Sequence, residues 1–137
     1  MIINKDNWIE FVLGKHPDFS EAWRRHLAYW EGDSPGLCID IAAFEHFFVE
    51  KLKEEDEASV AEILATVEIL LTDGTQDIID AAGTCFLESL LNESSWGRFD
   101  LKLVVGKLGP RSREICSAWD KFTGVQTDGL KEVEGQT

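Results

Sequence analysis

Apolar residues recur every three or four positions along most of this chain, a spacing that places them on one face of an α-helix. The pattern is clearest over residues 57–72, where the apolar positions keep helical register: Val60, Ile63, Leu64, Val67, Leu70 and Leu71. Similar stripes predict helices over 5–14, 18–30, 37–54, 76–91 and 110–123. The 37–54 segment is apolar on more than one face, which predicts a central helix with several neighbours.

Glycine and proline mark the breaks between these segments. Gly32 suits a helix C-terminus, Ser34-Pro35-Gly36 predicts a tight turn, and Pro110 suits the first position of the last helix. Residues 98–108 fit either a strand, because apolar residues alternate at 101, 103 and 105, or a helix. No other segment offers a partner strand, so we predict a helix there.

These segments predict an all-α fold with a single domain over residues 1–123. About seven antiparallel helices joined by short turns favour stacked helical hairpins, like a short α-solenoid. A length of 137 residues and 44% hydrophobic residues are sufficient for one ordinary core. Residues 124–137 read as a polar C-terminal tail.

Charge is concentrated in the middle of the chain. The net charge is −13, and residues 31–100 hold seventeen acidic side chains against three basic ones. Direct binding of nucleic acid requires Lys and Arg on the contact face, so this composition argues against it and against an anionic membrane. It predicts a partner with a basic surface, or acidity that serves solubility alone.

The cysteines and the N-terminal residues predict the cellular compartment of the protein. Cys38, Cys85 and Cys116 are odd in number, far apart and flanked by apolar residues, so we expect three unpaired thiols. Unpaired thiols fit the reducing cytoplasm. The N-terminal residues do not resemble a signal peptide, and no run of 18 apolar residues predicts a membrane span.

No catalytic, cofactor or metal site is predicted. The chain contains no G-x-x-x-x-G-K-[ST], C-x-x-C or H-E-x-x-H motif. His46 and Glu50 lie four residues apart and can share a helix face as metal ligands, but a lone His beside an acid is more often a surface pair. His16 and His26 are candidate general bases without a nucleophile motif nearby. A deep polar pocket containing His26 or His46 is the feature that would favour an enzyme.

The polar sides of the predicted helices supply the candidate binding residues. We expect carboxylates there to pair with Lys and Arg of a partner, and two aromatic residues to act as anchors. Tyr29 is an anchor candidate because it falls off the Trp23–Leu27–Trp30 stripe that is expected in the core. The candidate partner-binding set is Asp33, Asp40, Glu45, Glu50, Glu54, Asp77, Asp80, Glu88, Tyr29 and Trp96.

Three stretches of the sequence resemble a known group of proteins. They are WRRHLAYWEGDSPGLCIDIAAFEHFF (23–48), GTCFLESL (83–90) and GPRSREICSAWDKF (109–122). Together they resemble a small bacterial family of helical proteins. Some of its relatives look like immunity proteins encoded beside polymorphic or contact-dependent growth-inhibition toxins. The shared positions concern turns and core: Gly32, Pro35-Gly36, Gly109-Pro110 and Trp119.

The resemblance implies an inhibitor that binds a cognate toxin in the cytoplasm. Such toxins are often nucleases with a basic active-site cleft, which carboxylates can fill in place of phosphates. The sequence therefore predicts an immunity protein that neutralises a secreted bacterial toxin, such as an RNase, by occluding its basic active-site region. The alternative is a non-catalytic helical scaffold or adaptor that binds another protein and whose acidity serves solubility.

Overall fold

The computed structural model describes residues 1–130 and confirms the all-α, single-domain prediction. Within those residues the only strand-like pairing is an isolated bridge between Ile3 and Gly74. The α5, η2 and α6 segments follow one another without a break, and counted as one rod they leave seven α-helices in the described chain. The elements are α1 (Trp8–Lys15), η1 (Pro17–Phe19), α2 (Ser20–Tyr29), α3 (Leu37–Lys53), α4 (Glu57–Asp73), α5 (Gln76–Ala81), η2 (Ala82–Glu88), α6 (Ser89–Ser95), α7 (Lys102–Val105) and α8 (Pro110–Thr123).

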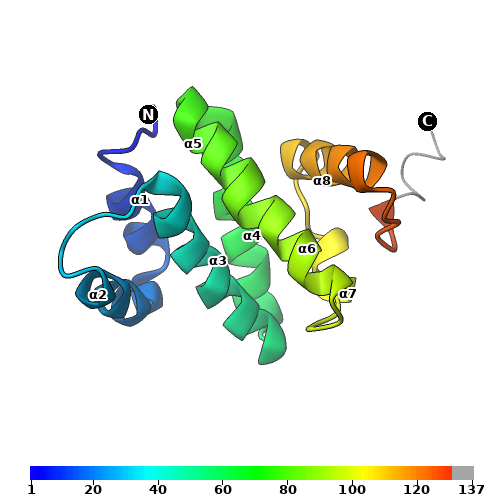
Figure 1. Cartoon of the computed structure of the whole chain (residues 1–137), viewed down its shortest axis with the longest axis horizontal. Coiled ribbons are helices and arrows are strands. Elements are labelled where there is room, and N and C mark those ends of the chain that lie inside the picture. Colours follow the sequence, from blue (N-terminus) through cyan, green and yellow to red (C-terminus); the bar gives the residue numbers. More distant parts are fainter. Residues whose placement is uncertain (131–137) are drawn as a thin grey trace.

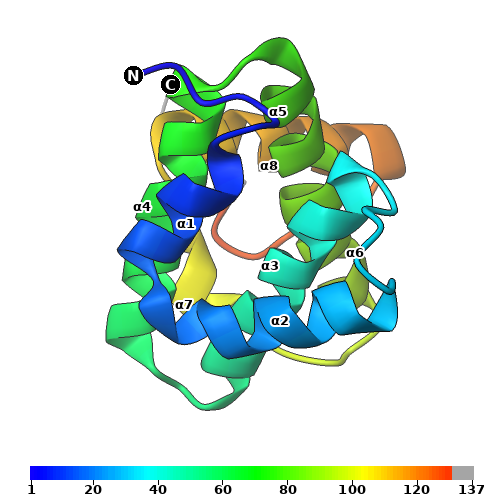
Figure 2. The same cartoon turned by 90° about the vertical axis from the view of Figure 1, so that its left-hand side faces the viewer.

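Helices α3, α4 and the α5–α6 rod form the middle of the molecule (Figure 1). Helices α1 and α2 lie at one end, and α7 and α8 lie at the other. Figure 2 looks onto the first end, with α1 and α2 nearest the viewer and α2 crossing in front of α3. Helix α3 packs against α2, α4 and η2, which agrees with its predicted central position. Helix α8 packs against both α4 and η2.

Phenylalanine rings join the elements at the centre of the core. The Phe19 and Phe44 ring centroids are 5.2 Å apart, and Phe86 lies 5.5 Å from Phe44 and 5.4 Å from Phe48. All four side chains are fully buried. Aromatic pairs at this separation add to the stabilisation that burial itself provides. The chain of rings therefore ties η1, α3 and η2 into one core.

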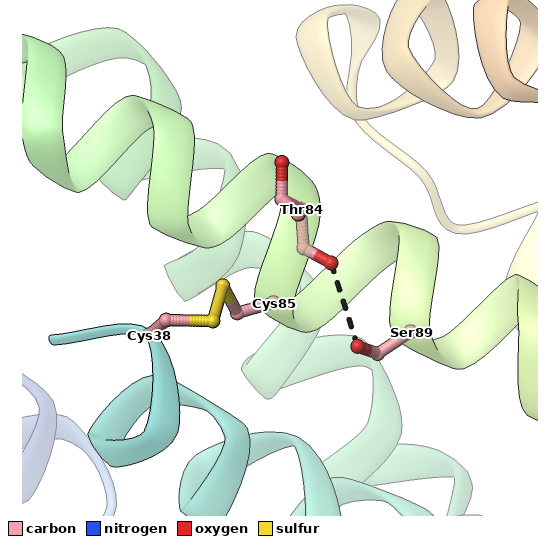
Figure 3. Close-up of a disulfide and its surroundings, with 4 residues drawn as sticks. All are labelled: Cys38, Thr84, Cys85 and Ser89. Atoms are coloured by element: carbon pink, nitrogen blue, oxygen red, sulfur yellow. Dashed lines mark hydrogen bonds between the residues drawn. A yellow bond between two sulfur atoms is a disulfide. The ribbon is translucent and has the colours of Figure 1, made fainter. Parts of the chain in front are cut away.

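A disulfide bond between Cys38 and Cys85 corrects the expectation of three unpaired cysteines. It joins the start of α3 to η2, with Cα atoms 5.4 Å apart and a separation of 47 positions in sequence. Figure 3 shows this bond beside the hydrogen bond from the Ser89 hydroxyl to the Thr84 carbonyl, 3.4 Å. Sequence spacing did not indicate the pair, because helix packing alone brings the two cysteines together.

Cys116 is the one free cysteine of the described chain, and it is buried in α8. Burial raises the pKa of its thiol to about 12, so it stays protonated and unreactive at neutral pH. Since the other two cysteines are paired, the cysteine content no longer argues for a reducing compartment. No helix among residues 1–130 has the length and apolar character needed to cross a membrane.

The ends of some helices differ from the predicted bounds. The residues before Trp8 form a turn and not the first turn of the helix. In this turn, the side-chain oxygen Oδ1 of Asn4 accepts hydrogen bonds from the backbone amides of Asp6 and Asn7. The α5–α6 rod continues to Ser95 rather than ending near residue 91. Only four residues of the 98–108 segment, Lys102–Val105, are helical, and the described chain gives them no partner strand.

The predicted apolar stripe of α2 is only partly in the core. Trp23 packs edge-on against Trp8, with ring centroids 5.7 Å apart, and also contacts Phe19. In contrast, Leu27 is 38% exposed and Trp30 is 37% exposed, so their predicted burial is wrong. Helix α2 lies at the end of the molecule, where only one of its sides has a neighbour (Figure 2). Its last turn therefore carries apolar surface.

Helix α8 is capped by a carboxylate from α4. Glu68 accepts hydrogen bonds from the backbone amides of Arg111 and Ser112, both 3.0 Å, and from the Ser112 hydroxyl at 2.9 Å. A negative charge at a helix N-terminus satisfies its free N–H groups and opposes the helix dipole. Gly109 permits this approach, because a Cβ atom there would lie 2.5 Å from the Glu68 carboxyl carbon.

The predicted polar tail is held against the domain over its first residues. The Thr127 amide and hydroxyl both donate to Asp120, at 2.8 Å each, and Leu130 is 2% exposed. The chain therefore continues to pack after α8 ends. Residues 131–137 of the predicted tail lie outside the described residues.

Candidate functional site

The acidic middle of the chain forms an exposed surface with few cations. Of the seventeen carboxylates between residues 31 and 100, eleven are exposed, four are half-buried and two are buried. Among the ion pairs within residues 1–130, a single one involves an exposed member of this group: Lys51 Nζ lies 3.9 Å from Glu54. Most of the negative charge on this acidic surface is therefore not paired with a cation of the described chain.

Most of the candidate partner-binding residues lie on the surface. Asp33, Glu50, Glu54, Asp77 and Asp80 are exposed, and Glu88 is half-buried. The two anchor candidates are exposed as well, Tyr29 at 78% and Trp96 at 60%. The carboxylates are distributed over the α2–α3 link, the end of α3, α5 and η2. They form an extended surface rather than one compact patch.

Asp40 and Glu45 are corrections to this set. They are 7% and 0% exposed, respectively, so neither is available to a partner's surface. Helical periodicity placed them on the polar side of α3, but neighbouring segments cover these two positions, whereas His46 and Glu50 on the same helix stay exposed. Each of the two buried carboxylates belongs to a cluster of its own.

Asp40 binds two side chains from the preceding segment. His26 Nε2 lies 2.7 Å from one oxygen, and the Ser34 hydroxyl donates to the other at 2.6 Å. The carboxylate lies between serine and imidazole, whereas a nucleophilic triad needs the imidazole between the other two. We conclude that this cluster anchors the α2–α3 link on α3.

A hollow of about 300 Å³ lies between α2 and α3, and it contains two of the three histidines. Its lining residues are Ala22, Arg25, His26, Tyr29, Ala43, His46 and Phe47. The sequence-based criterion for an enzyme was a deep polar pocket with His26 or His46. This hollow includes both histidines, and the residues that line it include no serine, threonine or cysteine.

His46 also borders the second buried carboxylate. Its Nε2 lies 3.6 Å from Glu45 Oε1. Glu93 of α6 completes the cluster, in which one ligand atom from each residue lies within 4.8 Å of the other two. Burial raises the pKa of Glu45 to about 8, and the negative charge of Glu93 and a hydrogen bond with it contribute. Two carboxyl groups can hydrogen-bond to each other only through a shared proton.

Sequence analysis missed Glu93, which falls in the polar break after the predicted 76–91 helix. The structure extends that helix and turns Glu93 toward α3. His46 was paired with Glu50 by its four-residue spacing, but its carboxylate neighbours in the structure are Glu45 and Glu93. No pattern within α3 indicates the partner on α6.

His16 has a structural position instead of a catalytic one. It is 5% exposed, and its Nε2 lies 2.8 Å from the Thr66 hydroxyl of α4. Burial lowers the pKa of the His16 imidazole. The negative charges of Asp18 and Glu62 raise this pKa, and the positive charge of Lys15 lowers it further, but burial has the largest effect. The ring is therefore neutral at pH 7 and joins the α1–η1 turn to α4.

A larger hollow of about 760 Å³ lies between the end of α6, the α7 region and residues 125–129. Its charged lining residues are Asp100, Lys102, Arg113 and Asp128. Arg113 donates to the Val105 carbonyl at 2.6 Å, which fixes one side of its guanidinium. Mixed charges in the lining favour no particular ligand.

Comparison with known proteins gives a family without a described function. No curated protein and no solved structure matches the chain. The predicted relationship to immunity proteins therefore stays a prediction. One family model, described as "Domain of unknown function (DUF7674)", matches residues 9–124, which is most of the chain. The protein belongs to this family.

Proposed function

We propose that this protein acts by binding and that it neutralises a secreted bacterial toxin with a basic surface. The observation that supports the proposal is the exposed acidic surface of residues 31–100, which the described chain leaves almost without cations. Like charges held close together oppose folding, and they offer in return fast association with a basic partner. A toxin that cleaves RNA has such a basic surface.

An aromatic group beside the acids suits the anchoring that charges alone do not provide. Tyr29 and Trp30 stack edge-to-face with ring centroids 5.3 Å apart, and both are exposed. Glu31 and Asp33 follow directly in the link and are exposed too. Interfaces are dominated by a few aromatic or arginine anchors surrounded by polar residues. This end of α2 is the best-supported anchor region.

The first test is co-expression with the product of the open reading frame directly upstream. If the chain is its immunity protein, that product alone stops growth, co-expression restores growth, and the two proteins purify as a complex. A harmless upstream product, or growth arrest that the chain does not relieve, contradicts the proposal. In that case a scaffold or adaptor whose acidity serves solubility becomes the better account.

A charge-reversal variant tests the electrostatic part. Asp33→Lys, Glu50→Lys and Asp80→Lys change three exposed carboxylates without disturbing the core. We expect association with the toxin to slow about tenfold or more at low salt and to lose much of its salt dependence. The matched control reverses Asp6, Glu114 and Asp128, exposed acids outside the acidic segment. Equal rates for the two variants would show that total charge, and not this surface, matters.

The proposal includes a cytoplasmic location, where the protein would bind toxin that has entered the cell. Thiols are kept reduced in that compartment, so Cys38 and Cys85 are expected there as free thiols. To measure this, thiols are alkylated in intact growing cells before lysis. The peptides that contain Cys38 and Cys85 are then analysed by mass spectrometry. A pair recovered fully oxidised from growing cells would place the protein outside the cytoplasm.

A further inference from the structure

Glu45 is the most deeply buried acidic side chain of the described chain. Its side chain is 0% exposed, and as an ionised carboxylate it has no hydrogen-bond donor among residues 1–130, since Glu93 can hydrogen-bond to it only when one of the two carboxyl groups carries a proton. A buried carboxylate without donors is costly, and such groups in proteins are usually paired with a cation or bound to a metal. The chain could have placed an apolar residue there, so the carboxylate requires an explanation.

The side chains that meet Glu45 are of types that can bind a metal ion. Glu93 comes from α6, and His46 follows Glu45 on α3. One ligand atom of each lies within 4.8 Å of the others, and the His46 Nε2 to Glu45 Oε1 distance is 3.6 Å. These separations resemble those between ligand atoms around one ion, since ligands about 2.0–2.2 Å from a metal lie roughly 3–4 Å apart.

The type of ligand indicates the type of ion. One imidazole and two carboxylates suit Zn²⁺ or a similar divalent transition ion, whereas Mg²⁺ and Ca²⁺ prefer sites made of oxygen alone. Three protein ligands leave a position for water. His46 is exposed and Glu93 is half-buried, so an ion from solvent can reach Glu45 without opening the core.

We propose that Glu45, His46 and Glu93 bind a divalent transition-metal ion, with Zn²⁺ as the probe. The bound ion links α3 to α6, while Cys38–Cys85 links the start of α3 to η2 on the same rod. It thus stabilises the pairing of these two elements by binding the folded state alone. The site is separate from the proposed function, because Glu45 and Glu93 are outside the exposed acidic surface.

The test uses the full-length protein, purified with chelator and then freed of it. Titration with Zn²⁺ is expected to show one saturable site, and excess Zn²⁺ to raise the melting temperature. His46→Ala changes an exposed side chain, so it should leave the metal-free melting temperature within a degree or two while weakening Zn²⁺ binding at least about tenfold. Glu93→Gln should weaken binding to a similar degree. Mg²⁺ at the same concentration is expected to give no shift.

Glu50→Gln is the matched control, since Glu50 is an exposed acid four residues from His46 on the same helix. It should bind Zn²⁺ like the unchanged protein. If the unchanged protein shows no saturable Zn²⁺ binding, the site does not exist. If His46→Ala and Glu93→Gln bind as tightly as the Glu50→Gln control, Zn²⁺ is held elsewhere and the proposal is equally overturned. These two variants decide the matter even if Glu45→Gln fails to fold.

Discussion

Removing the Cys38–Cys85 bond is the perturbation whose effect can be calculated most directly. The two cysteines enclose a loop of 47 residues, and the chain-entropy relation gives about 4 kcal/mol at 25 °C for a loop of that length. The disulfide lowers the conformational entropy of the unfolded chain. The free energy of unfolding is therefore larger for the oxidised protein than for the reduced one. Cys38 is exposed and Cys85 is 5% exposed, so Cys38→Ala removes the bond with little effect on the core.

The stability change converts to a temperature. At roughly 2.1 cal/mol/K per residue, unfolding 137 residues has an entropy of about 290 cal/mol/K. A loss of about 4 kcal/mol then lowers the melting temperature by about 14 °C. We expect a phosphine reductant to lower the melting temperature of the unchanged protein by roughly this amount. The same reductant should not shift Cys38→Ala, which already lacks the bond.

Thermal melts followed by circular dichroism measure the effect, and thiol titration in denaturant confirms the redox state. The oxidised protein should show one reactive thiol, Cys116, and the reduced protein three. A shift below about 3 °C with three thiols present would refute the loop-closure reasoning. A similar shift in Cys38→Ala would show that the reductant acts at another place.

Three further predictions concern separate parts of the fold. His16 is neutral in the folded state because burial lowers its pKa, so the stability it contributes is present above pH 6.5 and is lost as the pH falls below that value; the urea midpoint should drop toward pH 5 in the unchanged protein and less in His16→Gln. Glu68→Ala removes the cap of α8 and should cost about 1–2 kcal/mol in urea unfolding, with Glu68→Gln closer to the unchanged protein; equal midpoints for both would contradict the capping role. Tyr29→Ala changes a side chain that is 78% exposed, so it should weaken toxin binding several-fold without changing the melting temperature, and unaltered affinity would remove this residue as an anchor.

Much of the fold was readable from the sequence because each helix carries its own signals. The apolar spacing of 57–72 and the Pro110 start predicted α4 and α8 within a residue, and the broad apolar surface of 37–54 predicted the central place of α3. Such signals are local. They depend on side chains one or two turns apart in the same segment.

Contacts between segments decided the rest. The Cys38–Cys85 bond, the Glu68 cap and the Glu45–Glu93 cluster each join residues more than 40 positions apart. Asp40 and Glu45 looked like surface acids because periodicity identifies a polar side but not whether a neighbour covers it. The same reason explains Leu27 and Trp30, whose apolar side is only partly covered by neighbouring segments.

The sequence by itself determined the class of fold, the order of the helices and the concentration of negative charge in the middle of the chain. The tertiary structure decided which carboxylates remain on the surface, which two cysteines meet, and that a histidine and two glutamates from α3 and α6 share one site. The physical reason is that helix formation follows from nearby residues, whereas burial and ligand geometry depend on how completed helices pack against one another.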